Sequence, residues 1–63
     1  MLNQNIMRQR VRRFIAELDI SVTKFCIKMG FSRTAYYRWL KNDLTFSDKR
    51  AEKIDEHLKQ YGF

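Results

Sequence analysis

The chain has 63 residues, enough for one small domain but too few to enclose a deep active-site cavity. It has no proline, two glycines and 44% hydrophobic residues, which excludes a collagen-like chain and argues against a disordered one. The single cysteine, Cys26, excludes an internal disulfide and a cysteine-rich zinc site, and predicts a reduced compartment such as the cytoplasm.

The net charge of +6 is distributed unevenly along the chain. Residues 1–41 contain nine basic and two acidic residues, whereas residues 42–63 contain four basic and five acidic ones. No apolar run approaches the roughly 20 residues that span a bilayer, so we expect a soluble, unprocessed protein with no membrane partner. The basic excess predicts a binding surface for an acidic partner, although a solvated basic face without a partner is the alternative.

The first predicted helix covers residues 5–18. Its apolar residues recur at intervals of three and four, so we expect them to face the core, with the arginines around the outside of the helix. The expected inward residues are Ile6, Val11, Phe14, Ile15 and Leu18.

Three further helices are predicted by serines that precede helical patterns and can cap the first backbone N–H groups. These serines are Ser21, Ser32 and Ser47. The expected helices cover residues 22–29, 33–41 and 48–60 or 61. Gly30 can take the left-handed conformation that ends the second helix, and Gly62 can end the last. We therefore predict an all-α fold, a compact bundle of about four helices forming a single domain over residues 1–63.

The second and third of these helices are short and separated only by a turn at residues 29–31, which is the layout of a helix-turn-helix. At 3.6 residues per turn, one side of the third helix is apolar, whereas the other carries basic, hydroxyl and aromatic groups. The apolar side contains Ala35, Tyr36, Trp39 and Leu40. The polar side contains Arg33, Thr34, Tyr37, Arg38 and Lys41.

Residues 6–60 resemble the lambda-repressor and Cro-like helix-turn-helix proteins, the XRE family, which are common in phages and bacteria. The family's core positions match Phe25, Met29, Phe31, Tyr36 and Trp39, its turn glycine matches Gly30, and Cys26 replaces a usual alanine. The segments SRTAYYRWLK and SDKRAEKIDEHL look like those of small phage-encoded regulators. The resemblance implies a sequence-specific transcriptional regulator, such as a repressor, that places its third helix in the major groove of double-stranded DNA.

Two departures from the family pattern change what is expected of individual residues. Val22 stands where many members have a glutamine that contacts a phosphate, so that contact is absent here. Leu40 and Ile15 stand where members often pair a glutamate with an arginine. We expect these two apolar side chains to touch in the core, which avoids the desolvation of an ion pair.

The candidates for base contacts lie at the start of the third helix and one turn further along. The guanidinium of Arg33 suits bidentate contact with guanine O6 and N7, while Thr34 and Tyr37 can reach a base edge, a thymine methyl group or a phosphate. An exposed arginine, a neutral first-turn threonine and a core tyrosine are the alternatives. The candidates for phosphate contacts are Thr23, Lys24, Lys28, Ser32, Arg38, Lys41 and Asn42.

A domain of this size makes few base contacts, which predicts a homodimer on two half-sites. Its dimer surface is expected to draw on Phe46, the outer face of residues 48–61, and Tyr61 and Phe63. The main alternative is a protein-interaction module that binds a repressor, a polymerase subunit or a toxin through apolar residues around Tyr37 and Phe46.

No catalytic, metal or cofactor site is predicted, and the chain is not expected to be an enzyme. A Cys26–His57 nucleophile pair is conceivable, but we expect Cys26 to be buried and His57 to lie on a charged helix face. A basic amphipathic surface bound to an anionic membrane is a further alternative, which is disfavoured because the first helix needs its apolar stripe for the core.

Overall fold

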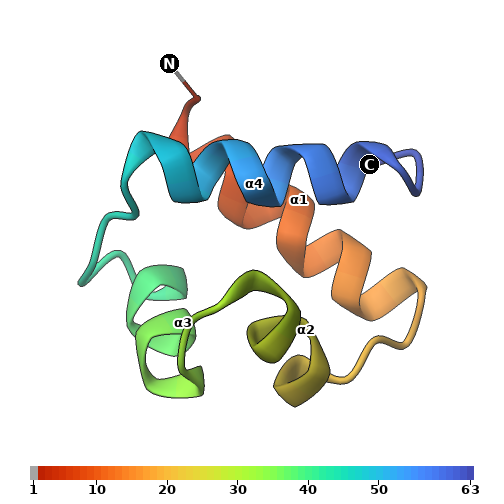
Figure 1. Cartoon of the computed structure of the whole chain (residues 1–63), viewed down its shortest axis with the longest axis horizontal. Coiled ribbons are helices and arrows are strands. Elements are labelled where there is room, and N and C mark those ends of the chain that lie inside the picture. Colours follow the sequence, from red (N-terminus) through yellow and green to blue (C-terminus); the bar gives the residue numbers. More distant parts are fainter. Residues whose placement is uncertain (1) are drawn as a thin grey trace.

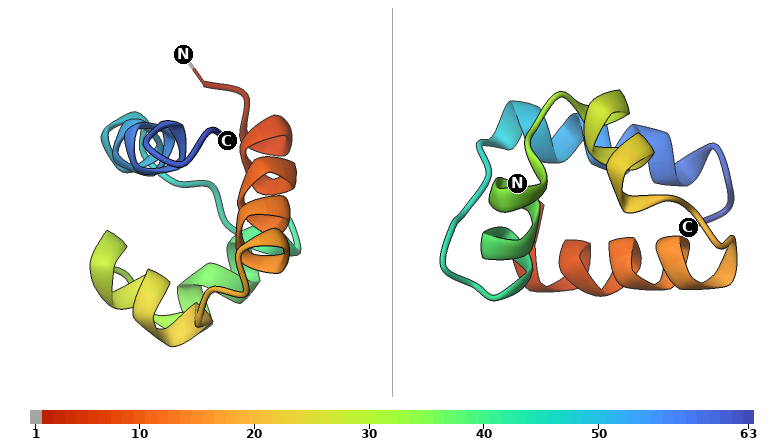
Figure 2. Two further views of the ribbon diagram at one scale, coloured as in Figure 1. Left: turned by 90° about the vertical axis from the view of Figure 1, so that its right-hand side faces the viewer. Right: turned by 90° about the horizontal axis from the view of Figure 1, so that it is seen from below.

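The computed structural model describes residues 2–63, which contain four α-helices and no β-strand (Figure 1). The helices are α1 (Gln4–Glu17), α2 (Val22–Met29), α3 (Arg33–Leu40) and α4 (Asp48–Lys59). Helix α1 packs against α4, and α2 packs against both α3 and α4. In the left view of Figure 2, α4 lies at the top, α2 and α3 lie at the bottom, and α1 runs down one side. The predicted all-α fold is confirmed.

Each helix begins at a residue whose side chain accepts a hydrogen bond from the backbone of the first turn. The predicted serine caps are confirmed, because Ser21 Oγ accepts from the N–H of Lys24 at 3.3 Å, and Ser32 and Ser47 make equivalent bonds. Asn3, which was not predicted as a cap, accepts from the N–H of Ile6 at 3.1 Å. It starts α1 at Gln4, one residue earlier than expected.

The ends of the helices follow from left-handed backbone conformations. Gly30, at φ +84°, closes α2 as predicted, and its N–H donates to the carbonyl of Cys26 at 2.8 Å. Asp19 and Asn42 also have positive φ angles just after α1 and α3, a conformation that Asn and Asp tolerate better than most residues. These bends keep α2 and α3 short and close together.

The core is formed by one face of every helix together with the loop before α4. Its buried apolar residues are Met7, Val11, Phe14, Phe25, Cys26, Met29, Tyr36, Trp39, Phe46, Ala51, Ile54 and Leu58. The ring of Phe46 stacks between those of Trp39 and Phe31, at 4.8 Å from each ring centre. The expectation that Phe46 contributes to a dimer surface is therefore wrong.

The predicted inward stripe of α1 is partly wrong. Ile6 is 55% exposed and Leu18 is 42% exposed, whereas Met7, which was not predicted, is fully buried. Ile6 lies about 100° around the helix from Met7, outside the stripe that Met7 shares with Val11 and Phe14. Leu18 is the C-cap, where the helix ends.

Ile15 and Leu40 stand where the resemblance implies an ion pair, and we expected them to lie in the core. Both are half-buried and pack against the core. Direct contact between the two side chains stays a prediction.

The prediction that the arginines lie around the outside of α1 is partly wrong, because Arg12 and Arg13 are exposed but Arg8 is buried and Arg10 half-buried. Arg8 is only 6% exposed and donates hydrogen bonds to the main-chain carbonyls of Trp39 and Leu44 and to Asn5 Oδ1. Arg12 donates to the carbonyl of Leu40 at 3.1 Å. Two arginines of α1 therefore donate to carbonyls in and after the last turn of α3, where backbone donors become scarce. The Trp39 carbonyl also accepts from the N–H of Asn42 at 3.0 Å.

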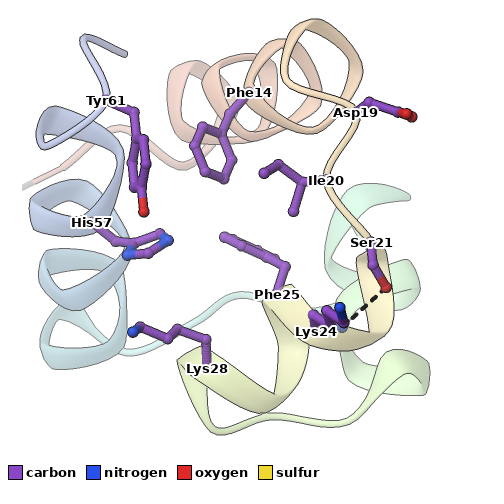
Figure 3. Close-up of a pocket in the computed structure, with 9 residues that line it drawn as sticks. All are labelled: Phe14, Asp19, Ile20, Ser21, Lys24, Phe25, Lys28, His57 and Tyr61. Carbon is purple, nitrogen blue, oxygen red and sulfur yellow. Dashed lines mark hydrogen bonds between the residues drawn. The ribbon is translucent and has the colours of Figure 1, made fainter.

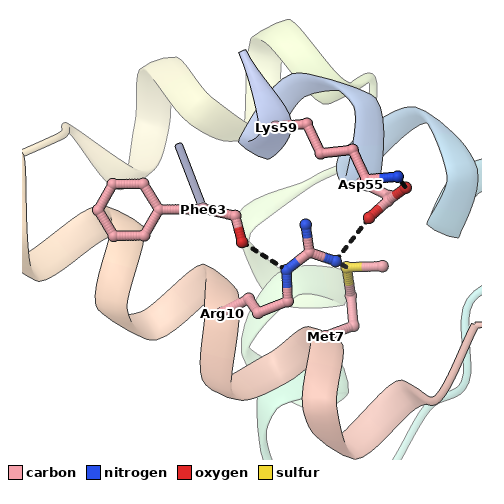
Figure 4. A network of polar contacts seen from close by, with 5 residues as sticks. All are labelled: Met7, Arg10, Asp55, Lys59 and Phe63. Atoms are coloured by element: carbon pink, nitrogen blue, oxygen red, sulfur yellow. Dashed lines mark hydrogen bonds and ion pairs between the residues drawn. The ribbon is translucent and has the colours of Figure 1, made fainter. Parts of the chain in front are cut away.

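The other two arginines of α1 also have partners within the chain. Arg13 pairs with Glu17 one turn along the same helix at 3.0 Å. Arg10 joins α1 to α4 by pairing with Asp55 and donating to the carbonyl of Phe63 at 2.8 Å (Figure 4). Arg8, Arg10 and Arg12 thus connect α1 to other parts of the fold, whereas the exposed ion pair of Arg13 stays within the helix.

Candidate nucleic-acid interface

The residues predicted to contact DNA lie on α2, on α3 and at the two ends of α3. Of the residues singled out from the sequence for DNA contact, every one is exposed. Those on and beside α3 are Ser32, Arg33, Thr34, Tyr37, Arg38, Lys41 and Asn42. Those on α2 are Thr23, Lys24 and Lys28.

Helix α3 presents two sharply different sides. Tyr36 and Trp39 are buried, and Ala35 and Leu40 are half-buried, as the periodicity predicted. The five polar residues on the other side span about 140° of the helix circumference at 100° per residue. We name this surface the α3 polar face, and it consists of Arg33, Thr34, Tyr37, Arg38 and Lys41.

Tyr37 projects from the α3 polar face with 48% of its surface exposed. Its ring meets that of buried Tyr36 edge to face, with ring centres 5.2 Å apart. Because one edge of the Tyr37 ring packs against the buried Tyr36 ring, the orientation of the exposed part of Tyr37 is restricted.

Charge is concentrated in this part of the molecule. Residues 20–42 contain five lysines and arginines and no acidic residue, so they hold +5 of the net charge of +6. Within residues 2–63, none of these five cations forms an ion pair, since the ion pairs found there involve Arg10, Arg13 and Lys59. The surface is therefore available to an external anion.

Side chains of α1 make the hydrogen bonds that hold α3. Besides the bonds from Arg8 and Arg12, Gln4 accepts a hydrogen bond from the indole Nε1 of Trp39 at 2.7 Å. The same side-chain amide donates to the carbonyl of Phe46 at 3.4 Å. All these bonds are made on the inner side or at the C-terminal end of α3, so its polar face is left clear.

The predicted phosphate contacts on α2 do not all lie beside the α3 polar face. Lys24 and Lys28 line a cavity between α2 and α4, and the side chain of Lys28 points toward His57 of α4 (Figure 3). The hydroxyl of Ser32 already accepts a bond from the N–H of Ala35 at 3.1 Å. The structure thus brings together the candidates on α3 and directs Lys28 elsewhere.

A second basic cluster, which the sequence analysis missed, lies at the start of α4. Lys49, Arg50 and Lys53 line a hollow of about 290 Å³ together with Ser47 and Gly30. The guanidinium of Arg50 lies 5.3 Å from the ring centre of Phe46. The net charge of −1 over residues 42–63 concealed this cluster, because the acidic residues of the same segment cancel its charge in the sum.

The sequence analysis expected His57 to lie on a charged helix face, and this expectation is wrong. Its ring is half-buried against those of Phe14, Phe25 and Tyr61, at centre distances of 5.7, 6.1 and 5.3 Å. Burial, assisted by the nearby charge of Lys28, lowers the pKa of His57 below its usual 6.5. The sequence carried no signal for this, because Phe14 and Phe25 come from two other helices.

Cys26 is buried, as predicted. Burial raises the pKa of its thiol above the usual 9.0, and the charge of Arg33 only partly opposes this effect. The thiol is therefore held in its protonated, weakly nucleophilic form.

No helix within residues 2–63 is both long and apolar enough to cross a membrane. The same part of the chain has no group of three or more His, Cys, Asp or Glu side chains placed to hold a metal ion. In comparisons with known proteins, no family model, curated protein or solved structure matches the chain. Any function must therefore be argued from the residues of this molecule.

Proposed function

We propose that the protein is a sequence-specific double-stranded DNA-binding regulator that places α3 in the major groove. The observation that carries the proposal is the α3 polar face, which combines charge, hydrogen-bond donors and an exposed aromatic ring on one side of a short helix. Each base pair presents a distinct pattern of donors and acceptors in the major groove, and an α-helix fits within it. The resemblance of residues 6–60 to XRE-type proteins supports the same proposal.

Within this proposal, base recognition belongs to Arg33, Thr34 and Tyr37. Arg33 is in the first turn of α3, the part of a recognition helix that enters the groove first. The positive charge of Arg33 lies at the positive end of the α3 dipole, which does not stabilise it. A hydrogen-bond acceptor on a ligand outside the chain would stabilise this charge better. A bidentate contact with guanine contributes about 1–3 kcal/mol of discrimination.

In this proposal, the cationic and hydrogen-bond-donating side chains around α3 contact the phosphates. Arg38, Lys41 and Asn42 lie toward its C-terminal end, and Thr23 and Lys24 lie in the first turn of α2. These groups position the protein on the duplex without reading its sequence. Binding is then expected to weaken steeply as salt concentration rises.

The test is selection of binding sites from a randomised duplex pool at two salt concentrations, with wild-type protein and single variants. The wild type should enrich one motif, Arg33→Ala should lose preference at one base pair, and Arg38→Ala should weaken binding to all sequences about equally. The matched control is Arg13→Ala, because Arg13 is an exposed arginine of α1 whose guanidinium contacts Glu17 and the Phe63 ring and no residue of α3. It should leave both motif and affinity unchanged. Salt-dependent binding without a motif would contradict sequence-specific recognition.

We further propose that the protein binds as a homodimer, since one α3 reaches few base pairs. The selected motif should then contain two half-sites whose centres are about 10 base pairs apart. The surface available to a second copy includes Tyr61, which is 53% exposed, but not the buried Phe46. A single unrepeated half-site together with a monomer in sedimentation on DNA would exclude the dimer.

Capture of a protein partner is the second candidate function. The observation in its favour is Ile27 of α2, which is 74% exposed beside the basic residues of the same helix. The burial of Phe46 removes half of the apolar patch that the sequence analysis assigned to such a partner. Absence of DNA binding at low salt would favour this function over DNA recognition.

A further inference from the structure

The basic cluster at the start of α4 surrounds a hollow of about 290 Å³ that is separate from the α3 polar face. The residues that line it come from the start of α4 and from the end of α2, and none belongs to α3. They are Met29, Gly30, Ser47, Lys49, Arg50 and Lys53. Three of these side chains are cationic and none is a carboxylate. Asp48 and Glu52 of the same helix are exposed and do not line the hollow.

The guanidinium of Arg50 is supported by two aromatic rings. Its central carbon lies 5.5 Å from the ring centre of Phe31 and 5.3 Å from that of Phe46. The two rings stack on each other with centres 4.8 Å apart, and Phe46 also stacks on the buried Trp39. Because the cation packs against rings that the core holds in place, its position is restricted before any ligand binds.

The Arg50 side chain has no polar partner within residues 2–63, although it is half-buried. Only its backbone N–H is bonded, to Ser47 Oγ at 3.2 Å. The half-buried Arg10, by contrast, pairs with Asp55 and donates to a carbonyl. A guanidinium carries five N–H donors in a planar fork that matches two oxygens of one oxyanion. The donors of Arg50 are therefore available to an external ligand.

Two lysines add charge at the same hollow. Lys49 and Lys53 are four residues apart and lie on one side of α4. A Cβ added at Gly30 would meet the Lys53 Nζ at 3.9 Å, so the amine lies close to the end of α2, and the missing side chain leaves this edge open. Three positive charges without a lining carboxylate favour a doubly charged anion over a singly charged one.

We propose that this hollow binds the phosphoryl group of a small phosphate monoester. The Arg50 guanidinium donates to two phosphoryl oxygens, and the amines of Lys49 and Lys53 neutralise the remaining charge. A monoester carries about −1.5 to −2 charges at pH 7 and has three terminal oxygens. A DNA backbone diester has one charge and two such oxygens, so it matches the three cations less well.

The experiment compares methyl phosphate with dimethyl phosphate, a monoester and a diester, at about pH 7.5 and constant ionic strength. Titration of the free protein, followed by ¹H–¹⁵N NMR, should show saturable shifts of the Gly30 and Lys49 amides and of the Arg50 Nε–H. The dissociation constant for methyl phosphate should be on the order of 1 mM. Dimethyl phosphate should bind about tenfold more weakly. Equal binding of the two, or shifts confined to residues 33–41, would overturn the proposal.

Variants separate the fork from the charge. Arg50→Lys keeps the charge but loses the fork, and should weaken binding of methyl phosphate about tenfold. Lys53→Gln changes an exposed side chain, so it does not disturb the core, and should weaken binding about threefold. The matched control is Arg13→Lys, an exposed arginine of α1, which should change nothing. Unchanged affinity in both Arg50→Lys and Lys53→Gln would exclude the site.

A last measurement keeps this proposal distinct from DNA recognition. Arg50→Lys should select the same DNA motif as the wild type, because no residue of the α3 polar face lines the hollow. Loss of phosphate monoester binding with an unchanged motif would support the separate site. Loss of the motif in this variant would instead show that Arg50 serves DNA binding, and would overturn the proposal.

Discussion

The guanidinium of Arg8 in α1 donates a hydrogen bond to the main-chain carbonyl of Trp39 in the last turn of α3, and lies 5.4 Å from the centre of the Trp39 ring. Since Arg8 also bonds the carbonyl of Leu44, one side chain satisfies acceptors at two places along the chain. This contact positions the C-terminal end of α3 relative to the rest of the core.

Arg8→Met is therefore expected to lower the free energy of unfolding by roughly 2–4 kcal/mol, because it removes the donor to the Leu44 carbonyl and one of the two donors to the Trp39 carbonyl. Urea denaturation followed by circular dichroism measures the change. Gln9→Met is the matched control, since Gln9 is exposed on the same helix and should change stability by less than about 0.5 kcal/mol. Equal stability of the two variants would show that Arg8 is dispensable.

Asp55 connects α1 to α4 and is the acceptor for both Arg10 and Lys59 (Figure 4). Asp55→Asn should destabilise the protein by about 1–3 kcal/mol, because it leaves the half-buried Arg10 guanidinium without its charge partner. Glu52→Gln, an exposed acidic position on the same helix, serves as the control in the same urea titration. Destabilisation of both variants to the same degree would point to helix charge and not to this bridge.

The same carboxyl gives a prediction at low pH. Hydrogen bonds from Arg10 and then Lys59 hold the pKa of Asp55 below its usual 3.8. The stabilisation is present above pH 3.8 and is lost as the pH falls through the lower folded-state value. Wild-type protein should therefore lose stability below pH 3.8 more steeply than Asp55→Asn, which has no carboxyl to protonate.

His57 predicts a separate loss of stability at mildly acidic pH. Because burial lowers its pKa below 6.5, the unfolded chain takes up a proton more readily than the folded one, and stability falls as the pH drops below 6.5. The charged groups around it are Lys24 and Lys28 of α2, Lys53 and Glu56 of α4, and Asp19 of the joint. Thermal unfolding between pH 7 and pH 5 should show a smaller decrease in melting temperature for His57→Gln than for wild type.

Lys28 supplies the control for that measurement. Its charge adds to the lowering of the His57 pKa, so Lys28→Gln should reduce the acid-induced loss while leaving the histidine in place. An unchanged pH profile in both variants would mean that another group is responsible.

Gly30 gives a prediction that depends only on backbone conformation. At φ +84° an added Cβ would meet nothing closer than the Lys53 Nζ at 3.9 Å, so Gly30→Ala is strained but not crowded. We expect a loss of about 1–2 kcal/mol in the free energy of unfolding. A chain of 63 residues can be synthesised with D-alanine at position 30, which favours positive φ and should be at least as stable as wild type. A destabilising D-alanine would show that space, and not conformation, requires the glycine.

Local signals in the sequence predicted the helices but not all of the packing. Ser21, Ser32, Ser47 and Gly30 act on neighbouring backbone groups, so the helix ends that depend on them could be read directly. The burial of Arg8 could not, because its acceptors are carbonyls more than 30 residues away that no side-chain pattern reveals.

The burial of the loop residue Phe46 is a second feature of the packing that the sequence could not predict. It lies outside any helix and shares no periodicity with the other core residues, although its ring fills the space between Phe31 and Trp39. For the candidate site, periodicity correctly separated the exposed and buried sides of α3. It could not show that the Lys28 side chain points toward α4, because this depends on how the helices pack.

The support of α3 has a consequence for how its exposed surface can change. Arg8 and Arg12 hold the helix by its main-chain carbonyls, and Gln4 holds it by the indole of a buried tryptophan. None of these bonds involves the exposed side chains of residues 33, 34, 37, 38 and 41. Those positions can therefore be exchanged, by evolution or in a library, while Tyr36, Trp39 and the three supporting residues keep the frame. A chain this small can thus change the chemistry of one exposed surface without first acquiring a new structure.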